Sequence, residues 1–472
     1  MSQATLVNEL GSKSVTAEVT FSLWQKLAIV VTLLIVACFV WLGWLQFLVG
    51  AFATITVFYF LVVAFKSALT YHSLSSGLVT FEEGAVAGLD GTALPTYTIL
   101  VPLYKESEVL EQLVCSLSGL DYPVQKLQIL LLLEECDSET IRAAKGMDLP
   151  TFFEMVIVPK GYPQTKPRAC NYGLQRARGE LVVIFDAEDV PDSDELKKAV
   201  LAFSQVDDDV MCVQARLEYF NPETNWLTRL FSAEYVNYFS LVLPGLGKLG
   251  LPVPLGGTSN HFQTDDLRKI GGSDSHNVTE DIDLGMWIAR CGGRVVLMDA
   301  VTLEEANSRL WNWIRQRSRW VKGYIQTYLV HMRKPLSLLN DLGLVNFIAF
   351  QVIVLGTPLT LLVNPILWAT TIVYAVTGWG FIELLYPPPV FALALINMVI
   401  GNFLFVYYIM TGCMVREMYA NVKWAFLSPV YWCLMSFAAW KAVIQLVHNP
   451  HYWEKTKHYL VSAPVRSRFP DS

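Results

Sequence analysis

The chain has 472 residues, of which 53% are hydrophobic, 12% aromatic and only 16% charged. A chain this apolar is predicted to be a polytopic membrane protein with one soluble part. Its net charge is -7, and the charged residues form neither a basic run nor an acidic tail. Nucleic acid is therefore not expected as a partner.

The eight cysteines are scattered singly, with no CxxC pair and no metal-ligand spacing. We therefore expect reduced, buried thiols in a cytosolic or membrane setting. They are Cys38, Cys115, Cys136, Cys170, Cys212, Cys291, Cys413 and Cys433.

The N-terminal part divides into a polar and an apolar segment. Residues 1–22 lack the features of a secretory signal and are predicted to be a retained cytosolic segment. Residues 23–66 are long enough for two spans of about 20 residues, with a break near Gly43 to Gly50. This pattern predicts a transmembrane hairpin whose two ends face the cytosol, although only a few lysines flank it.

Residues 67–335 have ordinary charge density and alternate short apolar runs with amphipathic stretches, which predicts a cytosolic α/β domain. The first helix is expected at 108–117. Strands are expected at 97–102, 128–133, 155–159 and 181–185.

The strand at 181–185 ends in an acidic loop that contains Asp186, Glu188 and Asp189. The carboxyl end of a central parallel strand is where open α/β sheets bind ligands. Acids spaced one apart there can hold a hard divalent cation that bridges to substrate phosphates. The alternative is that the loop only caps the helix that begins near Ser193.

Two other strand ends bring polar groups to the same rim of the sheet. Tyr104 and Glu106 follow the first strand, and Glu135 and Asp137 follow the second. A convergent acidic rim favours a nucleotide and metal site.

Apolar character returns over residues 336–447, in blocks at 342–376, 390–414 and 424–447. The first block is predicted to be an interface helix followed by a span, or a kinked hairpin. Basic residues put both the loop before 424 and the tail, 448–472, in the cytosol. A single span cannot satisfy both, so either 424–447 is re-entrant or in-plane, or the first block crosses twice.

Seven motifs in this order resemble family 2 inverting glycosyltransferases, and more narrowly the membrane-embedded, processive branch that contains cellulose, hyaluronan and poly-N-acetylglucosamine synthases. They are VPLYKE at 101–106, the strand end 135–137, KPRACN at 166–171, DAED at 186–189, LGGTSN at 255–260, TED at 279–281 and QRSRW at 316–320.

The resemblance implies a GT-A-like nucleotide-sugar-binding domain inserted between transmembrane helices, with amphipathic interface helices. It implies a multi-pass protein of the inner or plasma membrane with a cytosolic catalytic domain. The implied partners are a nucleotide-sugar donor, with UDP-sugar favoured, a growing β-linked glycan, the lipid bilayer and export subunits. The implied cofactor is Mg²⁺ or Mn²⁺.

Residue by residue, the resemblance assigns Asp186 and Glu188 to the metal, with Asp189 as the alternative to Glu188. It assigns Asp281 as general base, with Glu280 beside it. Acceptor contacts would come from Gly257, Thr258, Gln316 and Trp320. Donor contacts would come from Tyr104, Glu106, Glu135, Asp137, Lys166, Asp186 and Arg319.

The chemistry also follows from the residue types. Inverting transfer to a sugar hydroxyl needs a base near that oxygen and neutralisation of the departing diphosphate, which suit Asp281 and Arg319. The alternatives are a helix N-cap at Thr279 to Asp281 and an amphipathic interface helix around QRSRW. The alternative functions are a ceramide-glucosyltransferase-like enzyme that makes one glycolipid, or a catalytically silent receptor or scaffold.

The tail motif Trp453 to His458 is similar to a tail of hyaluronan-type synthases thought to fold over the donor site. The alternative is a solvated basic tail.

Overall fold

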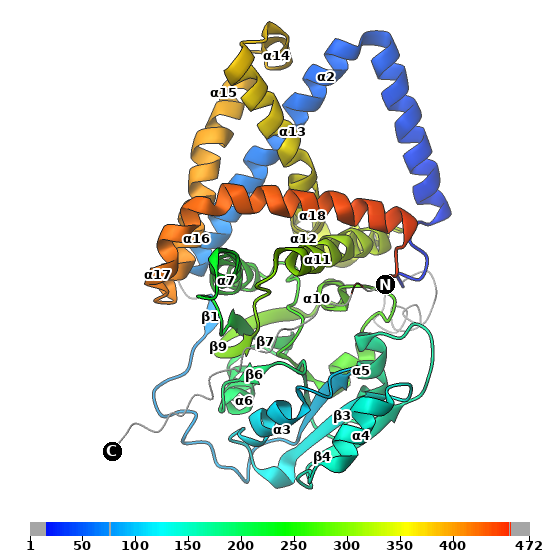
Figure 1. The fold of residues 1–472 in the computed structure, drawn as a ribbon, viewed down its shortest axis with the longest axis vertical. Helices are drawn as coiled ribbons and strands as arrows, with labels where there is room; N and C mark the ends of the chain where they lie inside the picture. The colour runs from blue at the N-terminus through cyan, green and yellow to red at the C-terminus, as the bar shows by residue number, and fades with distance from the viewer. Residues whose placement is uncertain (1–15, 75–76, 453, 455–472) are drawn as a thin grey trace.

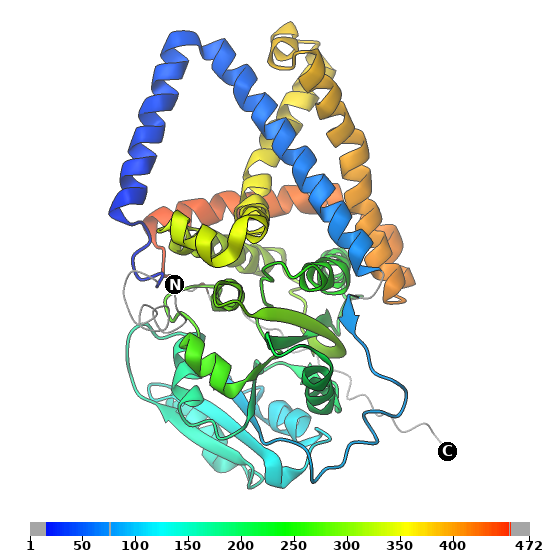
Figure 2. The same cartoon turned by 180° about the vertical axis from the view of Figure 1, so that it is seen from behind.

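The computed structural model describes residues 16–74, 77–452 and 454. Most of the predicted N-terminal segment 1–22 and tail 448–472 therefore lie outside the described residues, as does the tail motif except for Glu454. A sheet domain forms one half of the molecule and long apolar helices form the other, with a layer of shorter helices between them (Figures 1 and 2).

The four strands predicted from the sequence are all present and lie side by side in one sheet. Their order is β5 (Leu181–Ile184), β2 (Tyr97–Leu103), β3 (Leu127–Glu134) and β4 (Phe153–Val158), and all pairs are parallel. Every residue of β3 is buried, as its unbroken apolar run requires. The carboxyl ends of these strands, including the predicted acidic loop, therefore meet at one edge.

The other half of the sheet is mixed. β8 (Asn260–Gln263) is antiparallel to β5 and to β7 (Val210–Tyr219), and β9 (Arg294–Glu304) is parallel to β7. β1 (Leu78–Val79) and β6 (Val190–Pro191) both pair with β9. The acidic loop thus connects a central strand to the end of β9.

Helices cover both faces of the sheet. Alternate residues of β2 point to two separate cores: Leu100 belongs to one, and Ile99 and Val101 to the other. The helices of this domain are α3 (Leu110–Ser118), α4 (Ser138–Gly146), α5 (Lys166–Leu174), α6 (Glu195–Gln205), α9 (Thr264–Ile270) and α10 (Glu280–Arg290).

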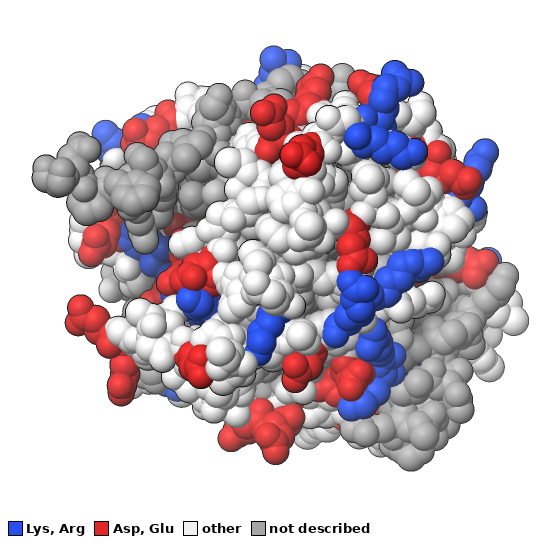
Figure 3. Space-filling view, turned by 90° about the horizontal axis from the view of Figure 1, so that it is seen from below, with Lys and Arg blue, Asp and Glu red and all other residues white. Residues whose placement is uncertain are grey.

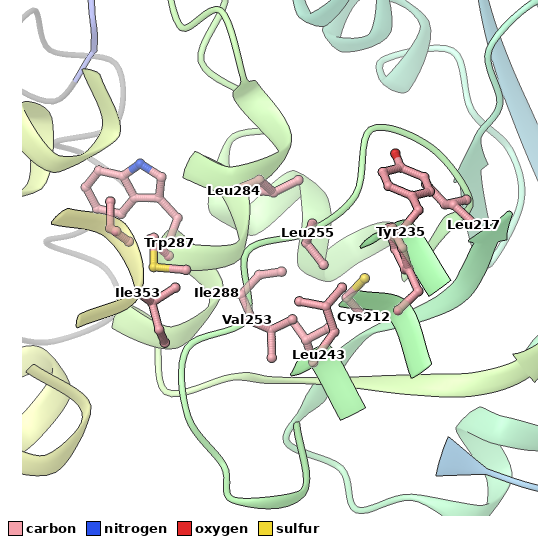
Figure 4. Close-up of a cluster of buried hydrophobic side chains, with 14 of the residues drawn as sticks. Cys212, Leu217, Tyr235, Leu243, Val253, Leu255, Leu284, Trp287, Ile288 and Ile353 are labelled. Atoms are coloured by element: carbon pink, nitrogen blue, oxygen red, sulfur yellow. The ribbon is translucent and has the colours of Figure 1, made fainter. Parts of the chain in front are cut away.

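A helical run joins the sheet domain to the apolar helices. It comprises α7 (Trp226–Asn237), the π-helix η2 (Tyr238–Val242) and α8 (Leu243–Lys248). The run is largely buried. Its side chains pack with those of β7 and α10 into a continuous apolar cluster (Figure 4).

Two amphipathic helices complete this middle layer. α11 (Leu310–His331) carries QRSRW, and α18 (Ser428–His448) packs along it, lying crosswise to the other long apolar helices (Figure 1). Arg317 of α11 is buried and forms an ion pair with Glu234 of α7. Its guanidinium also donates to the Tyr431 hydroxyl of α18 at 2.7 Å, so one side chain joins three helices.

The described chain contains four helical segments that are long and apolar enough to cross a membrane: Leu23–Ser73, Pro335–Thr377, Pro388–Val415 and Tyr419–His448. The first, α2 (Leu23–Ser73), bends at Gly43, inside the predicted break, and its two limbs diverge (Figure 1). The crosswise direction of α18 favours the in-plane alternative for 424–447. The remaining elements are α12 (Pro335–Phe350), η3 (Gln351–Leu355), α13 (Gly356–Thr377), α14 (Gly380–Leu385), α15 (Pro388–Ile396), η4 (Asn397–Gly401), α16 (Asn402–Val415), α17 (Tyr419–Val422), η5 (Lys423–Leu427) and η1 (Val124–Lys126).

All eight cysteines are free, as predicted, but the expectation that all are buried was wrong. Cys38, Cys115, Cys136 and Cys433 are exposed. Cys38 and Cys433 lie on the apolar helices α2 and α18, on surfaces that no other part of the described chain covers. At the end of the sheet domain remote from the apolar helices, acidic and basic side chains are interspersed (Figure 3).

Candidate active site

The acidic loop at the end of β5 holds Asp186 beside the amino end of α5. Lys166 is the first residue of α5, and its Nζ lies 2.5 Å from Asp186 Oδ1. The same ammonium donates to the carbonyl oxygen of Gly257 at 2.7 Å. Three segments that are far apart in the sequence thus meet at one lysine.

Asp281 lies on the other side of Gly257, in the first turn of α10. A Cβ atom added to Gly257 would stand 3.5 Å from Asp281 Oδ2. Lys166, Gly257, Glu280 and Asp281 together line one pocket. The structure therefore brings residues predicted to bind donor, metal and acceptor to a single place, next to the predicted base.

Helix capping, the alternative for Thr279 to Asp281, accounts for little of this motif. Thr279 occupies the N-cap position of α10, but its hydroxyl makes no capping hydrogen bond. Asp281 Oδ1 accepts the N–H of Ile282 at 2.8 Å, and its Oδ2 faces Gly257. One carboxylate oxygen of Asp281 thus remains directed at the pocket.

The charges in this pocket perturb one another. Burial alone lowers the pKa of Lys166, but the contact with Asp186 and the charge of Glu280 outweigh burial and raise it overall. Burial and then the neighbouring Asp281 raise the pKa of Glu280 to about 7. Burial also raises the pKa of Asp281. Perturbed, mutually interacting carboxyls in a pocket are typical of functional sites.

Arg319 of α11 brings a second cation to these carboxylates. Burial lowers its pKa, while Glu280, Asp281 and Asp186 oppose that effect with their negative charge. Its neighbour Arg317 has a different environment, since it pairs with Glu234. In QRSRW, Arg319 therefore belongs to the site and Arg317 to helix packing. The motif alone does not tell the two arginines apart.

Two predicted acceptor residues of α11 are engaged by the protein. Gln316 Oε1 accepts from Asn307 Nδ2 at 2.8 Å. The indole of Trp320 is stacked with Tyr235 at a centroid distance of 6.1 Å, and the Arg317 guanidinium lies 4.7 Å from its centroid. Trp320 is partly exposed, and its ring packs against an aromatic ring and a guanidinium.

The predicted nucleotide corner lies at the ends of β2 and β3. Asp137 is 6% exposed, and its carboxylate accepts the N–H of Lys105 at 2.5 Å and that of Thr140 at 3.3 Å, capping α4. Glu135 is exposed and accepts from the Lys160 N–H at 2.8 Å. The Glu106 N–H donates to Thr140 Oγ1 at 3.2 Å, so the loop that carries Tyr104 and Glu106 is tied to α4.

Glu304, at the end of β9, is a candidate site residue that we did not predict. Burial and the charges of Asp186 and Glu188 raise its pKa to about 8. The sequence feature that could have indicated it is a pair of acidic residues, 304–305, at the end of an apolar strand. It was missed because nothing in the sequence pairs β9 with the acidic loop.

Among the described residues, no group of three or more His, Cys, Asp or Glu side chains is spaced to hold a metal ion by itself. The residues nonetheless fit an ion that is shared with substrate phosphates, which commonly takes only one or two carboxylates from the protein. Asp186 and Glu188 supply that number. The Lys166 ammonium at Asp186 shows that this carboxylate accepts a cation at close range.

Comparisons with known proteins relate the chain to glycosyltransferases. Residues 95–323 match the family model described as "Glycosyltransferase like family 2". The probable glycosyltransferase YdaM of Bacillus subtilis is 24% identical over 49% of this chain and 55% of its own length. The beta-monoglucosyldiacylglycerol synthase of Synechocystis is 26% identical over 62% of each chain. The chain thus spans about half to three fifths of these curated relatives.

Among solved structures, the mannosyltransferase PcManGT from Pyrobaculum calidifontis, in complex with GDP-Man and Mn²⁺, superposes with a TM-score of 0.54. It is 18% identical, and the match covers 84% of this chain and 99% of that one. This likeness concerns the fold, which is a mixed α/β sheet of the GT-A-like kind. Residues 95–323, just under half of the chain, are thus similar in sequence to glycosyltransferase family 2 domains.

Proposed function

We propose that the protein is an inverting, metal-dependent glycosyltransferase that works at a membrane from a nucleotide-sugar donor, with UDP-sugar as the first donor to test. The observation that carries this proposal is the meeting of Lys166, Asp186, Gly257 and Asp281 in one place. It combines one cation, Lys166, and a carboxylate able to hold a metal ion, Asp186, for a diphosphate with a second carboxylate, Asp281, for a hydroxyl proton.

Each residue then has a separate task. Asp281 accepts the proton of the acceptor hydroxyl as that oxygen attacks the anomeric carbon from the side opposite the diphosphate. Arg319 and Lys166 balance the charge that develops on the departing diphosphate. A divalent ion held by Asp186 and Glu188 would supply further electrostatic stabilisation of that diphosphate.

We propose elongation and export of a β-linked polysaccharide as the outcome, with the sheet domain facing the cytosol of a plasma or inner membrane. A single transfer to a lipid is the second candidate, and one observation favours it. Polar side chains of the apolar helices bond to neighbouring helices. The Tyr59 hydroxyl donates to Asn364 Oδ1 at 3.1 Å, and Asn397 Nδ2 donates to the backbone carbonyl of Thr56 at 2.8 Å. Polar groups engaged in such bonds are not free to bind a glycan that passes between these helices.

The test is to incubate membrane vesicles with a panel of radiolabelled nucleotide sugars, with and without Mn²⁺. Organic extraction and sizing of the aqueous product separate a glycolipid from a polymer. Asp281→Asn should retain donor binding and lose about 10² to 10⁴-fold in turnover, because the amide cannot take up a proton. Asn caps a helix nearly as well as Asp, so near-normal turnover would reduce Asp281 to a structural residue.

A further inference from the structure

Asp189, the last acid of the DAED motif, is held inside the protein. It is 1% exposed, and its Oδ2 accepts the backbone N–H of Asp186 at 2.6 Å. In return, the N–H of Asp189 donates to the carbonyl oxygen of Asp186 at 3.2 Å. The loop is thus closed twice across its own ends. Both bonds run to the backbone of the proposed metal ligand.

The same carboxylate oxygen is bound to a second loop. The Thr258 hydroxyl donates to Asp189 Oδ2, lies 3.0 Å from the carbonyl oxygen of Ile184, and is completely buried. Lys166 makes a second connection between these loops, since it contacts both the Asp186 carboxylate and the Gly257 carbonyl. Asp186 is therefore tied to the segment 257–258 in two ways. Its N–H is bonded to Asp189, which contacts Thr258, and its carboxylate is bonded to Lys166, which contacts Gly257.

The loop around Thr258 is itself rigidly anchored. Ser259 has a φ of +57°, a value that is costly for a residue other than glycine and persists only where the surroundings enforce it. Its hydroxyl donates to Thr302 Oγ1 at 2.6 Å, and Thr302 donates to Glu195 Oε2 at 2.7 Å. All three side chains are fully buried. Thr258 is thus held in place by the core, and it holds Asp189 in place in turn.

We propose that Asp189 is a positioning residue that clamps the metal-binding loop to the 257–259 loop, and that Glu188 is the second metal ligand. Asp189 Oδ2 is already used by two donors, and its Oδ1 is buried away from the surface. Glu188, by contrast, is partly exposed. The inference rests on the proposed function, because it assumes that a metal binds at Asp186.

Binding of Mn²⁺ tests the clamp without measuring turnover. The full chain, purified in detergent, is titrated with Mn²⁺ in the presence of UDP while free Mn²⁺ is followed by electron paramagnetic resonance. Asp189→Asn keeps one side-chain oxygen that can accept hydrogen bonds from the Asp186 N–H and the Thr258 hydroxyl. The affinity of this variant for Mn²⁺ should therefore stay within about threefold of that of the unaltered protein. Asp189→Ala and Thr258→Val should each weaken binding by about tenfold, because either change opens the clamp.

The two open-clamp changes should also be non-additive. If both act through one hydrogen bond, the double variant should bind Mn²⁺ about as weakly as either single variant. Thr258→Ser retains the hydroxyl and should behave like the unaltered protein. Thr258 cannot be a metal ligand in the arrangement described, so its effect on affinity identifies positioning.

Three results would overturn the clamp: loss of Mn²⁺ binding in Asp189→Asn comparable to that in Asp186→Ala, unchanged affinity in both Asp189→Ala and Thr258→Val, or additive losses in the double variant. If Asp186→Ala itself binds Mn²⁺ normally, the metal site of the proposed function fails instead. Thr258→Val is nearly isosteric and keeps the test decisive if Asp189→Ala does not fold.

Discussion

Gly323 of α11 packs directly on Thr279, the residue that precedes α10, with no room for a side chain between them. This contact sets the distance between the helix that carries Arg319 and the helix that begins with Glu280 and Asp281. Thr279 belongs to the predicted base motif, and Gly323 follows QRSRW by three residues. The glycine thus allows the two motifs to face each other.

Gly323→Ala should therefore disturb the site more than its size suggests. The added methyl must push α11 away from Thr279, and overpacking of this kind costs about 1 to 3 kcal/mol of stability. We expect transfer to fall by at least about tenfold, because small displacements of positioned groups are costly. Donor turnover and thermal unfolding in detergent measure both effects.

Gly146→Ala is the matched control, because nothing lies within 4 Å of a Cβ at that position. It should leave turnover and unfolding temperature unchanged. Turnover of Gly323→Ala equal to that of Gly146→Ala would show that the α10–α11 contact does not set the geometry of the site.

Arg317 and Arg319 should respond differently to the same substitution. Arg317→Ala removes the ion pair and leaves the Glu234 carboxylate with the Tyr431 hydroxyl, which donates to it at 2.7 Å. The loss should lower the free energy of unfolding by about 3 kcal/mol, the lower end for a buried ion pair, because Glu234 is partly exposed. Arg319→Ala should lower turnover strongly and cost less stability, because burial disfavours the charged guanidinium, as its lowered pKa shows, and the substitution removes that cost.

Unfolding and transfer assays on the two variants give the comparison. Equal losses of stability in both would contradict the separation of a structural arginine from a site arginine.

The sequence predicted the positions of the buried strands and the acidic residues at their ends, because these depend on local patterns of apolar residues. It did not separate Arg317 from Arg319, since their partners lie at Glu234 and among the α10 carboxylates, far along the chain. It missed Glu304 for the same reason. The burial of residues 231–251 depends on the packing of α16 and α2 against them, which no local pattern encodes.

Cys136 offers a native probe of donor binding. It is exposed between Glu135 and Asp137, and Gln164 Nε2 lies 2.8 Å from its Sγ. In a protein whose other exposed cysteines, Cys38, Cys115 and Cys433, are replaced by Ser, an impermeant maleimide should label Cys136 in opened membranes and not in intact cells. UDP-sugar should slow that labelling several-fold, because the base would cover this corner.

Labelling of Cys136 from outside intact cells would contradict a cytosolic sheet domain. Labelling that is indifferent to every nucleotide would move the donor away from the ends of β2 and β3.

Asp274 should make stability depend on pH. Its carboxylate accepts the N–H groups of Ala17 and His276, at 2.5 and 2.9 Å, and burial followed by the charge of Asp283 raises its pKa to about 7. The unfolded chain loses this proton near pH 4. Between about pH 4 and 7 the folded state therefore holds the proton more tightly, so stability falls as pH rises through this window.

Asp274→Asn should flatten that slope, whatever its absolute stability. Unfolding temperatures measured with EDTA from pH 4.5 to 8 give the comparison, and Asp265→Asn, at an exposed position, serves as control. A slope unchanged by Asp274→Asn would assign the dependence to other groups.

The segment that follows α18 rests on α11. Lys322 donates to the carbonyl of Tyr452 at 2.8 Å and Gln326 to that of Pro450 at 3.0 Å, while Gln25 at the start of α2 donates to the carbonyl of Leu329 at 2.6 Å. One helix thus bears Arg319, the beginning of the first apolar helix and the end of the last. A shift of α11 by even part of a turn would therefore move Arg319 together with the contacts at Tyr452 and Gln25. If the proposed function holds, binding of the donor and the arrangement of the apolar helices are mechanically coupled through α11.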